Sequence, residues 1–161
     1  MSLRVIATGG TFDKHYDEIR GKLDFAESYL PAVLKRCRLT LPHTLHVLPL
    51  LDSLDMTEAD RQRVLDACRA ATEPAIVIIH GTDTMRETAA VLGAANLPAA
   101  IVLTGAMIPY EVANSDALFN LGCAVGVAQT LPHGVYVAMN GQVFPWDNVQ
   151  KNRSAGVFQP L

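Results

Sequence analysis

The sequence predicts an α/β fold, an open three-layer parallel sheet with helices on both faces, of the flavodoxin or Rossmann type. Short apolar runs alternate with helical patterns along the whole chain, and this alternation is typical of parallel sheets built from strand–helix–strand units. The central run 75–79, Ala-Ile-Val-Ile-Ile, is apolar throughout, as expected for a strand that is covered on both faces. Polar turns follow the runs, and in open α/β sheets ligands bind at such turns.

Each expected element has a local reason. The strands are apolar runs that are too short for an ordinary helix. Thr57 is expected to cap one helix, because Glu58 and Asp60 place negative charge in its first turn. Thr84 and Glu87 have the spacing of a capping box, which predicts the start of another helix. The expected strands are 3–7, 46–50, 75–79, 99–103 and 134–139, and the expected helices are 26–37, a segment that begins after Thr57, 85–95 and 115–129.

Two segments lack these patterns. Residues 12–25 are charged and have no clean period, so we expect a long loop that acts as a lid. Residues 140–161 carry a possible hairpin around 143–146 and then a polar stretch. Phe144 and Trp146 have two equally weighted interpretations: they form a contact with another subunit, or they cover the edge of the sheet.

Length and composition predict one cytoplasmic domain, residues 1–161. Half of the residues are apolar, the formal net charge is −3, and no basic patch of the kind that nucleic acid requires is present. No apolar run approaches the roughly 20 residues of a membrane span, and residues 1–4 lack the architecture of a signal peptide. Cys37, Cys68 and Cys123 are odd in number and widely separated, which favours buried thiols over a disulfide or a metal site. We therefore expect no nucleic acid, membrane or metal partner.

The polar turns carry the candidate functional groups. Paired glycines precede Thr11 after the first strand, and Asp52 follows the second. Glycines in this place can bind a nucleotide phosphate, but G-x-G-x-x-G and Gly-Lys-Ser/Thr are both absent. The favoured interpretation is a sharp turn that lets the backbone approach a substrate closely and presents the Thr11 hydroxyl.

A threonine hydroxyl is a weak nucleophile that needs a base or a proton path. The candidates are Tyr16, and Lys151 acting with Asp83 through Thr82. An aspartate beside a lysine favours the charged amine, whereas burial favours the neutral amine. His80 is expected to be a buried core residue without a catalytic role. From the residues alone, each candidate could equally be an ordinary polar residue of the surface.

Three motifs together resemble the bacterial-type L-asparaginase family. They are Thr-Gly-Gly-Thr-Phe at 8–12, His-Gly-Thr-Asp-Thr-Met-Arg-Glu-Thr-Ala at 80–89 and Thr-Gly-Ala-Met-Ile-Pro at 104–109. Residues 52–56 and 149–151 add weaker matches in the right order and spacing, so the resemblance covers essentially the whole chain. It implies hydrolysis of the side-chain amide of asparagine, and in some members of glutamine, without metal or cofactor.

The resemblance also implies roles for single residues. Thr11 matches the nucleophile and Tyr16, in the lid, the tyrosine that assists it. Ser53 matches the serine that binds the substrate α-carboxylate, and the carbonyl of Ala106 matches the acceptor of the leaving amide. Asp83 would also hold the substrate ammonium group. The implied catalytic residues are Thr11, Tyr16, Thr82, Asp83 and Lys151, and the implied substrate-binding residues are Gly10, Asp52, Ser53, Gly81 and Ala106.

The expected reaction is the release of ammonia from L-asparagine through an acyl-enzyme on Thr11, which water then hydrolyses to L-aspartate. Backbone N–H groups of Gly10 or of the Thr82 turn would stabilise the oxyanion. The rival interpretation is a non-catalytic amino-acid-binding module derived from such a domain.

Two departures from the family pattern bear on the site. Family members are usually about twice as long, so the chain resembles a short, single-domain branch without the carboxyl-terminal domain. The missing groups would have to come from elsewhere, and we expect a homo-oligomer, most simply a two-fold dimer. In addition, Leu54 stands where many relatives carry a polar residue.

Overall fold

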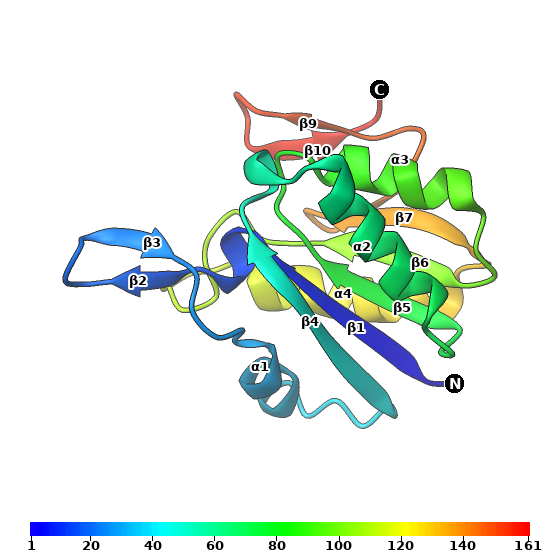
Figure 1. The fold of residues 1–161 in the computed structure, drawn as a ribbon, viewed down its shortest axis with the longest axis horizontal. Coiled ribbons are helices and arrows are strands. Elements are labelled where there is room, and N and C mark those ends of the chain that lie inside the picture. The colour runs from blue at the N-terminus through cyan, green and yellow to red at the C-terminus, as the bar shows by residue number, and fades with distance from the viewer.

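The computed structural model describes residues 1–161 and has a six-stranded central sheet with the strand order β4-β1-β5-β6-β7-β8 (Figure 1). The first five strands in this order run parallel, and β8 pairs antiparallel with β7. The sheet strands are β1 Leu3–Gly9, β4 His43–Leu51, β5 Ala75–Ile79, β6 Ala100–Thr104, β7 Gly134–Met139 and β8 Gln142–Pro145. The helices are α1 Leu30–Arg36, α2 Glu58–Arg69, α3 Met85–Ala95 and α4 Ala117–Thr130.

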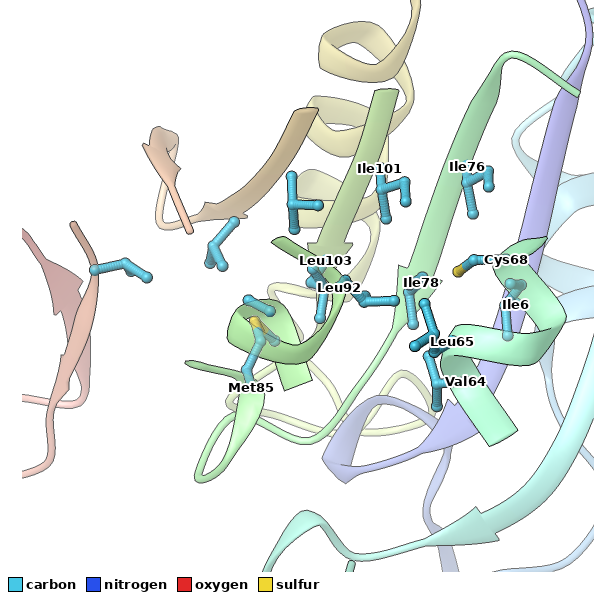
Figure 2. Close-up of a cluster of buried hydrophobic side chains, with 14 of the residues drawn as sticks. Ile6, Val64, Leu65, Cys68, Ile76, Ile78, Met85, Leu92, Ile101 and Leu103 are labelled. Carbon is cyan, nitrogen blue, oxygen red and sulfur yellow. The ribbon is translucent and has the colours of Figure 1, made fainter. Parts of the chain in front are cut away.

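Both faces of the sheet are covered, which confirms the three-layer α/β prediction. Alternate residues of β5 point to opposite sides. Ile76 and Ile78 pack with α2 and α3 in one hydrophobic cluster (Figure 2), whereas Val77 and Ile79 pack with α1 and α4 in the other. All of these side chains are at most 1% exposed. A strand with both faces buried has no polar alternation, which is why its sequence is apolar throughout.

The sixth strand makes the sheet mixed, where the sequence predicted a fully parallel one. Asn140 and Gly141 both have positive φ, +57° and +73°, and they join Met139 directly to its partner Gln142. A two-residue turn of this kind can only connect antiparallel strands. The hairpin predicted around 143–146 therefore turns at 140–141.

Residues 12–25 do not form the expected irregular loop. A 3-10 turn, Thr11–Asp13, is followed by a hairpin of β2 His15–Asp17 and β3 Lys22–Asp24. In Figure 1 this hairpin projects away from the central sheet. Strands of three charged or mixed residues are too short to show a two-residue period, so the sequence pattern could not indicate them.

The helix expected over 26–37 is shorter at both ends. It covers Leu30–Arg36, with Pro31 in its first turn, where proline is tolerated because its missing N–H would have no helical partner. Of the three cysteines, Cys68 on α2 is the one that is buried as predicted. Cys37 is exposed just beyond the end of α1, and Cys123 on α4 is half-buried.

The aromatic residues of the tail cover the sheet. Phe144 on β8 is 4% exposed, and Trp146 packs on Gly93 of α3, where an added Cβ would lie 2.3 Å from the indole ring. Phe144 therefore covers the edge of the sheet, as the second interpretation expected. It is not available for a contact with another subunit, so one of the two aromatic residues expected for that contact is lost. A second hairpin follows, with β9 Gln150–Asn152 and β10 Val157–Gln159. None of the helices combines the length and the apolar character needed to cross a membrane.

Candidate active site

The turns that carry the predicted site residues lie at the carboxyl ends of β4, β1, β5 and β6, which are neighbours in the sheet. The turn after β1 carries Gly10 and Thr11, and the turn after β5 carries Gly81 and Thr82. Gly10 has φ +74°, and a Cβ there would lie 2.4 Å from the backbone nitrogen of Gly81. The two turns therefore touch backbone to backbone, a contact that requires glycine at this position.

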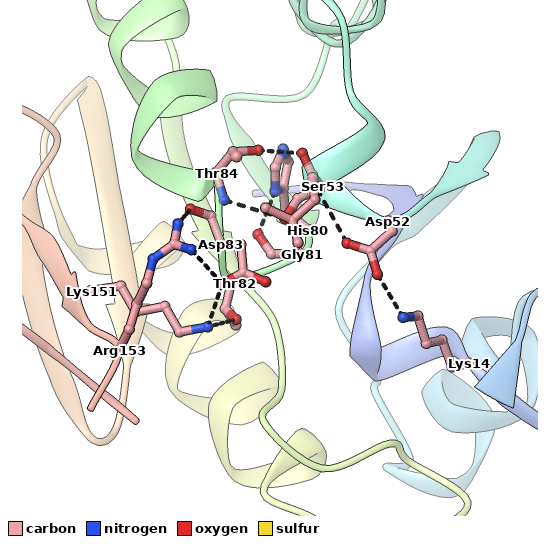
Figure 3. Close-up of polar contacts among 11 residues, drawn as sticks. Lys14, Asp52, Ser53, His80, Gly81, Thr82, Asp83, Thr84, Lys151 and Arg153 are labelled. Carbon is pink, nitrogen blue, oxygen red and sulfur yellow. Dashed lines mark hydrogen bonds and ion pairs between the residues drawn. The ribbon is translucent and has the colours of Figure 1, made fainter. Parts of the chain in front are cut away.

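Ser53 brings the turn after β4 into the same cluster. An added Cβ on Gly81 would lie 2.6 Å from Ser53 Oγ. This Oγ accepts a hydrogen bond from the Thr84 N–H at 3.2 Å, and Thr84 Oγ1 donates to the Ser53 carbonyl at 2.7 Å (Figure 3). Because Ser53 Oγ acts as an acceptor here, its own proton remains available for a ligand.

The same exchange overturns the predicted capping box of α3. Thr84 does precede the helix, but its side chain caps no helical N–H, since its hydroxyl donates to Ser53 instead. At α2 the prediction that Thr57 caps the helix is confirmed. Thr57 accepts from the Asp60 N–H, and the Asp60 carboxylate accepts from the Thr57 N–H at 2.8 Å.

Lys151 joins the turn after β5 from the far end of the chain. Its Nζ donates to Thr82 Oγ1 at 2.7 Å and to Asp83 Oδ1 at 2.9 Å (Figure 3). The side chains of Lys151 and Asp83 are 12% and 30% exposed. The structure thus brings the predicted set of threonine, aspartate and lysine into direct contact.

Arg153 is a second cation on Asp83 that the sequence did not indicate. Its Nη2 donates to the Asp83 carbonyl at 3.0 Å, and its Nη1 lies 3.7 Å from Asp83 Oδ1. Both cations approach the same carboxylate oxygen, so Oδ2 is the oxygen that remains open to a ligand. The sequence contains no local signal for this contact, because the two residues are 70 positions apart.

Lys14 is another residue that sequence reasoning missed. Its Nζ lies 2.6 Å from Asp52 Oδ2, and this hydrogen bond is the largest cause that lowers the pKa of the Asp52 carboxyl. The Lys14 N–H closes the 3-10 turn onto the Thr11 carbonyl at 3.3 Å, and residues three apart in such a turn share a face. The ion pair therefore connects the Thr11 turn to the turn of Asp52 and Ser53.

The backbone N–H groups expected to bind an oxyanion differ in their availability. The Gly10 N–H donates to the Leu51 carbonyl at 2.9 Å, so it is already engaged. The N–H of Thr82 makes no backbone hydrogen bond. Of the two predicted sources, the Thr82 turn is the one with a free donor.

The remaining predicted residues lie farther from this contact network. Tyr16 is on β2 and is 55% exposed, and no hydrogen bond joins its phenol to the turns after β1, β4 and β5. Ala106 is 1% exposed and lies in the loop after β6, one residue after Gly105. Asp116 holds this loop by accepting from the Met107 N–H at 3.0 Å, so the position of Ala106 is well defined.

His80 is a buried core residue, as expected. Its Nδ1 lies 2.7 Å from the Gly81 carbonyl, and its Nε2 lies 2.8 Å from Thr88 Oγ1. A carbonyl can only accept, so we assign the proton to Nδ1, with Nε2 accepting from the Thr88 hydroxyl. Complete burial lowers the pKa of His80 to about 4, so the ring is neutral at neutral pH.

The buried ring predicts that stability falls in mild acid. The unfolded chain takes up the His80 proton below about pH 6.5, whereas the folded chain resists it until about pH 4. The contribution of neutral His80 to the free energy of unfolding is therefore fully present above pH 6.5. It is lost as the pH drops toward 4, and the loss amounts to roughly 3 kcal/mol. Urea unfolding midpoints measured across this range provide the test.

A matched pair of variants isolates His80 from the other titrating groups. Burial raises the pKa of Asp13, so its titration changes the free energy of unfolding with pH in the opposite direction. The contribution of His80 is therefore measured by comparing two variants that both retain Asp13. His80→Gln is expected to flatten the profile, while His133→Gln, at an exposed position, is expected to keep the slope of the unmodified chain. Equal slopes in the two variants would contradict the assignment.

Comparison with known proteins points to one family. The family model described as asparaginase, N-terminal, matches residues 2–158. L-asparaginase 1 of Escherichia coli (strain K12) is 32% identical over 167 residues, covering 96% of this chain and 48% of that protein. A glutamyl-tRNA(Gln) amidotransferase component of Pyrobaculum aerophilum is 33% identical over 136 residues, covering 80% of this chain and 32% of that protein.

Similarity of structure extends over the whole chain. The thermostable L-asparaginase from Thermococcus kodakarensis has a TM-score of 0.89 at 31% identity, covering 100% of this chain and 51% of that chain. The chain thus spans about half the length of the L-asparaginases that it matches. With a family-model match over nearly all of its residues, it belongs to the asparaginase family.

Proposed function

We propose that this chain hydrolyses the side-chain amide of L-asparagine to L-aspartate and ammonia through an ester on Thr11. The observation that carries the proposal is the hydrogen-bonded set of Thr82, Asp83 and Lys151, packed directly against the turn that bears Thr11. A nucleophile next to a group that can exchange protons is the arrangement that covalent catalysis requires.

The proton path follows from these contacts. Attack of Thr11 Oγ on the amide carbon forms a C–O bond and releases the hydroxyl proton. The pair of Lys151 and Asp83 takes up this proton through Thr82 and returns it to the amide nitrogen, so that the C–N bond breaks and ammonia leaves. Water then attacks the ester carbon, the bond between this carbon and Thr11 Oγ breaks to release aspartate, and a proton of the water restores the Thr11 hydroxyl.

The surrounding groups match the charges of such a substrate. Asp83 Oδ2 is open to the α-ammonium group, and the free proton of Ser53 Oγ can be donated to the α-carboxylate. The N–H of Thr82 supplies a donor for the oxyanion, and a preorganised donor of this kind commonly contributes about 3 kcal/mol to transition-state binding. The role of Tyr16 depends on whether its hairpin brings the phenol to Thr11.

The alternative is a module that binds an amino acid without turning it over. Leu54, which is 62% exposed, offers no polar contact to the α-carboxylate, and this bears on the affinity and selectivity for the amino acid more than on the type of reaction. Such a module would keep Asp83 and Ser53 as ligands, and Thr11 would be dispensable. Assembly as a two-fold homo-oligomer, which would close the pocket, stays a prediction.

A coupled assay separates the two functions. Purified protein is incubated with L-asparagine and, in parallel, L-glutamine, and ammonia is measured together with aspartate binding by calorimetry. The proposed function predicts steady ammonia release from asparagine that depends on enzyme concentration. Aspartate binding without any ammonia release would favour the binding module.

A further inference from the structure

The carboxylate of Glu111 joins segments that are far apart in the sequence. Glu111 lies in the loop after β6 that contains Ala106, and its Oε1 accepts a hydrogen bond from the backbone N–H of Tyr16 in β2. Its Oε2 accepts a second hydrogen bond from the hydroxyl of Tyr29, just before α1. One side chain therefore ties the hairpin β2–β3 and the start of α1 to the Ala106 loop.

Tyr29 extends this connection to the turn that carries Thr11. Its backbone N–H donates to Oδ1 of the fully buried Asp13 at 2.7 Å. Its ring stacks on His15, with 3.9 Å between the ring centroids and an interplanar angle of 14°. Tyr29 thus contacts the 3-10 turn through its N–H, the hairpin through its ring and Glu111 through its hydroxyl.

The hairpin has few other attachments. Its ion pairs, formed by Asp17, Arg20, Lys22 and Asp24, are all internal. Ile19 is 91% exposed, and no hairpin residue belongs to either hydrophobic cluster. An isolated hairpin with such short strands is marginally stable. The bond to Glu111 is the one hydrogen bond from residues 15–24 to the chain beyond residue 27.

The charge on Glu111 makes this attachment a strong one. The hydrogen bond from Tyr29 is the largest cause that lowers the pKa of the Glu111 carboxyl. Burial and the adjacent carboxylate raise the pKa of the Tyr29 hydroxyl, so an ionised acceptor faces a neutral phenol at neutral pH. Hydrogen bonds to ionised acceptors are about twice as strong as those between neutral groups.

We propose that Glu111 is a positioning residue for Tyr16. Because Glu111 binds the backbone of Tyr16 itself, it sets the point from which the phenol extends, and Tyr29 holds the carboxylate in place for this task. The catalytic consequence rests on the proposed function, whereas the attachment of the hairpin does not. The inference gives two residues outside the family motifs a specific role.

Amide hydrogen exchange measures the attachment directly. Glu111→Ala is expected to raise the exchange rate of the Tyr16 amide by about tenfold or more, because a hydrogen bond to a charged acceptor is lost. Amides of β1 and β5 should be unchanged, which shows that the fold is intact. Tyr29→Phe keeps the ring and should give a smaller increase, and Glu18→Gln, at an exposed hairpin position without a hydrogen bond, should give none.

An activity measurement separates positioning from general stability. Glu111→Ala is expected to lower kcat for asparagine several-fold at nearly constant KM, and Glu111→Asp, which retains a carboxylate, should restore part of the loss. The proposal is overturned if the Tyr16 amide is unprotected in the unmodified chain, if its exchange does not rise in Glu111→Ala, or if exchange rises while kcat in an active enzyme stays the same. Absence of ammonia release from the unmodified chain would refute the proposed function, and the exchange result would still decide the attachment.

Discussion

Thr11→Ala is expected to lower kcat for ammonia release from asparagine by roughly 10⁴-fold or more, as removal of a nucleophile generally does. The Thr11 hydroxyl is the one group on the turn after β1 that can form an ester, and the backbone contact of Gly10 with Gly81 brings this turn next to the turn that carries Thr82. Aspartate binding should persist, because the proposed ligands of the amino acid lie on other turns. Hydroxylamine should divert the ester of the unmodified enzyme to aspartyl hydroxamate.

The control for this prediction is a threonine substitution elsewhere. Thr40→Ala changes an exposed residue between α1 and β4 and should leave kcat within a factor of about two, since surface substitutions rarely act at a distance. Thr11→Ser, which retains a hydroxyl, should recover measurable turnover and hydroxamate formation. Near-full activity of Thr11→Ala would end the proposal of a threonyl ester.

Lys151→Met is expected to lower kcat by about 10²-fold to 10⁴-fold, the usual contribution of a positioned proton-transfer group. The substitution preserves the side-chain stem but removes the amine that bonds to both Thr82 Oγ1 and Asp83 Oδ1. It leaves Asp83 paired with Arg153 alone. Steady-state kinetics, with a circular dichroism check of the fold, provide the measurement.

Two further substitutions show whether the loss of kcat is specific to the Lys151 site. Lys35→Met removes an exposed lysine on α1 and should leave kcat unchanged. Asp83→Ala should raise KM as well as lower kcat, because the substrate ammonium loses its partner. If Lys151→Met turned over asparagine at nearly the unmodified rate, the proton path through Thr82 would be refuted.

Local patterns were sufficient for the parts of the fold that are buried on both sides. The predicted bounds of β5, 75–79, and of α3, 85–95, agree with the structure, because uninterrupted burial and helical periodicity leave a direct trace in the sequence. The gathering of Thr11, Ser53 and Thr82 at one edge was also predictable, since parallel strands end on the same side.

Contacts between residues that are far apart in the sequence could not be predicted from local patterns. Ser53 and Thr84 are 31 positions apart, and their exchange replaced a capping box that the local spacing indicated. Lys14 pairs with Asp52 across 38 positions, and the sequence around each residue contains no pattern that predicts the other as its partner. The pairing of β8 differs from these contacts, because Asn140 and Gly141 form a local turn that joins β8 to the strand directly before it.

The attachment of Lys151 to Thr82 has a consequence for how the protein becomes functional during synthesis. The contact spans 69 positions, so the amine leaves the ribosome well after β1, β5 and the Thr11 turn. Domains begin to fold while the chain is still growing, at about 5–20 residues per second. The sheet edge with Thr11 can therefore assemble several seconds before the proton path is complete. If the proposed function is correct, a nascent chain that already presents Thr11 lacks its proton path until β9 has been synthesised and docks on the turn after β5.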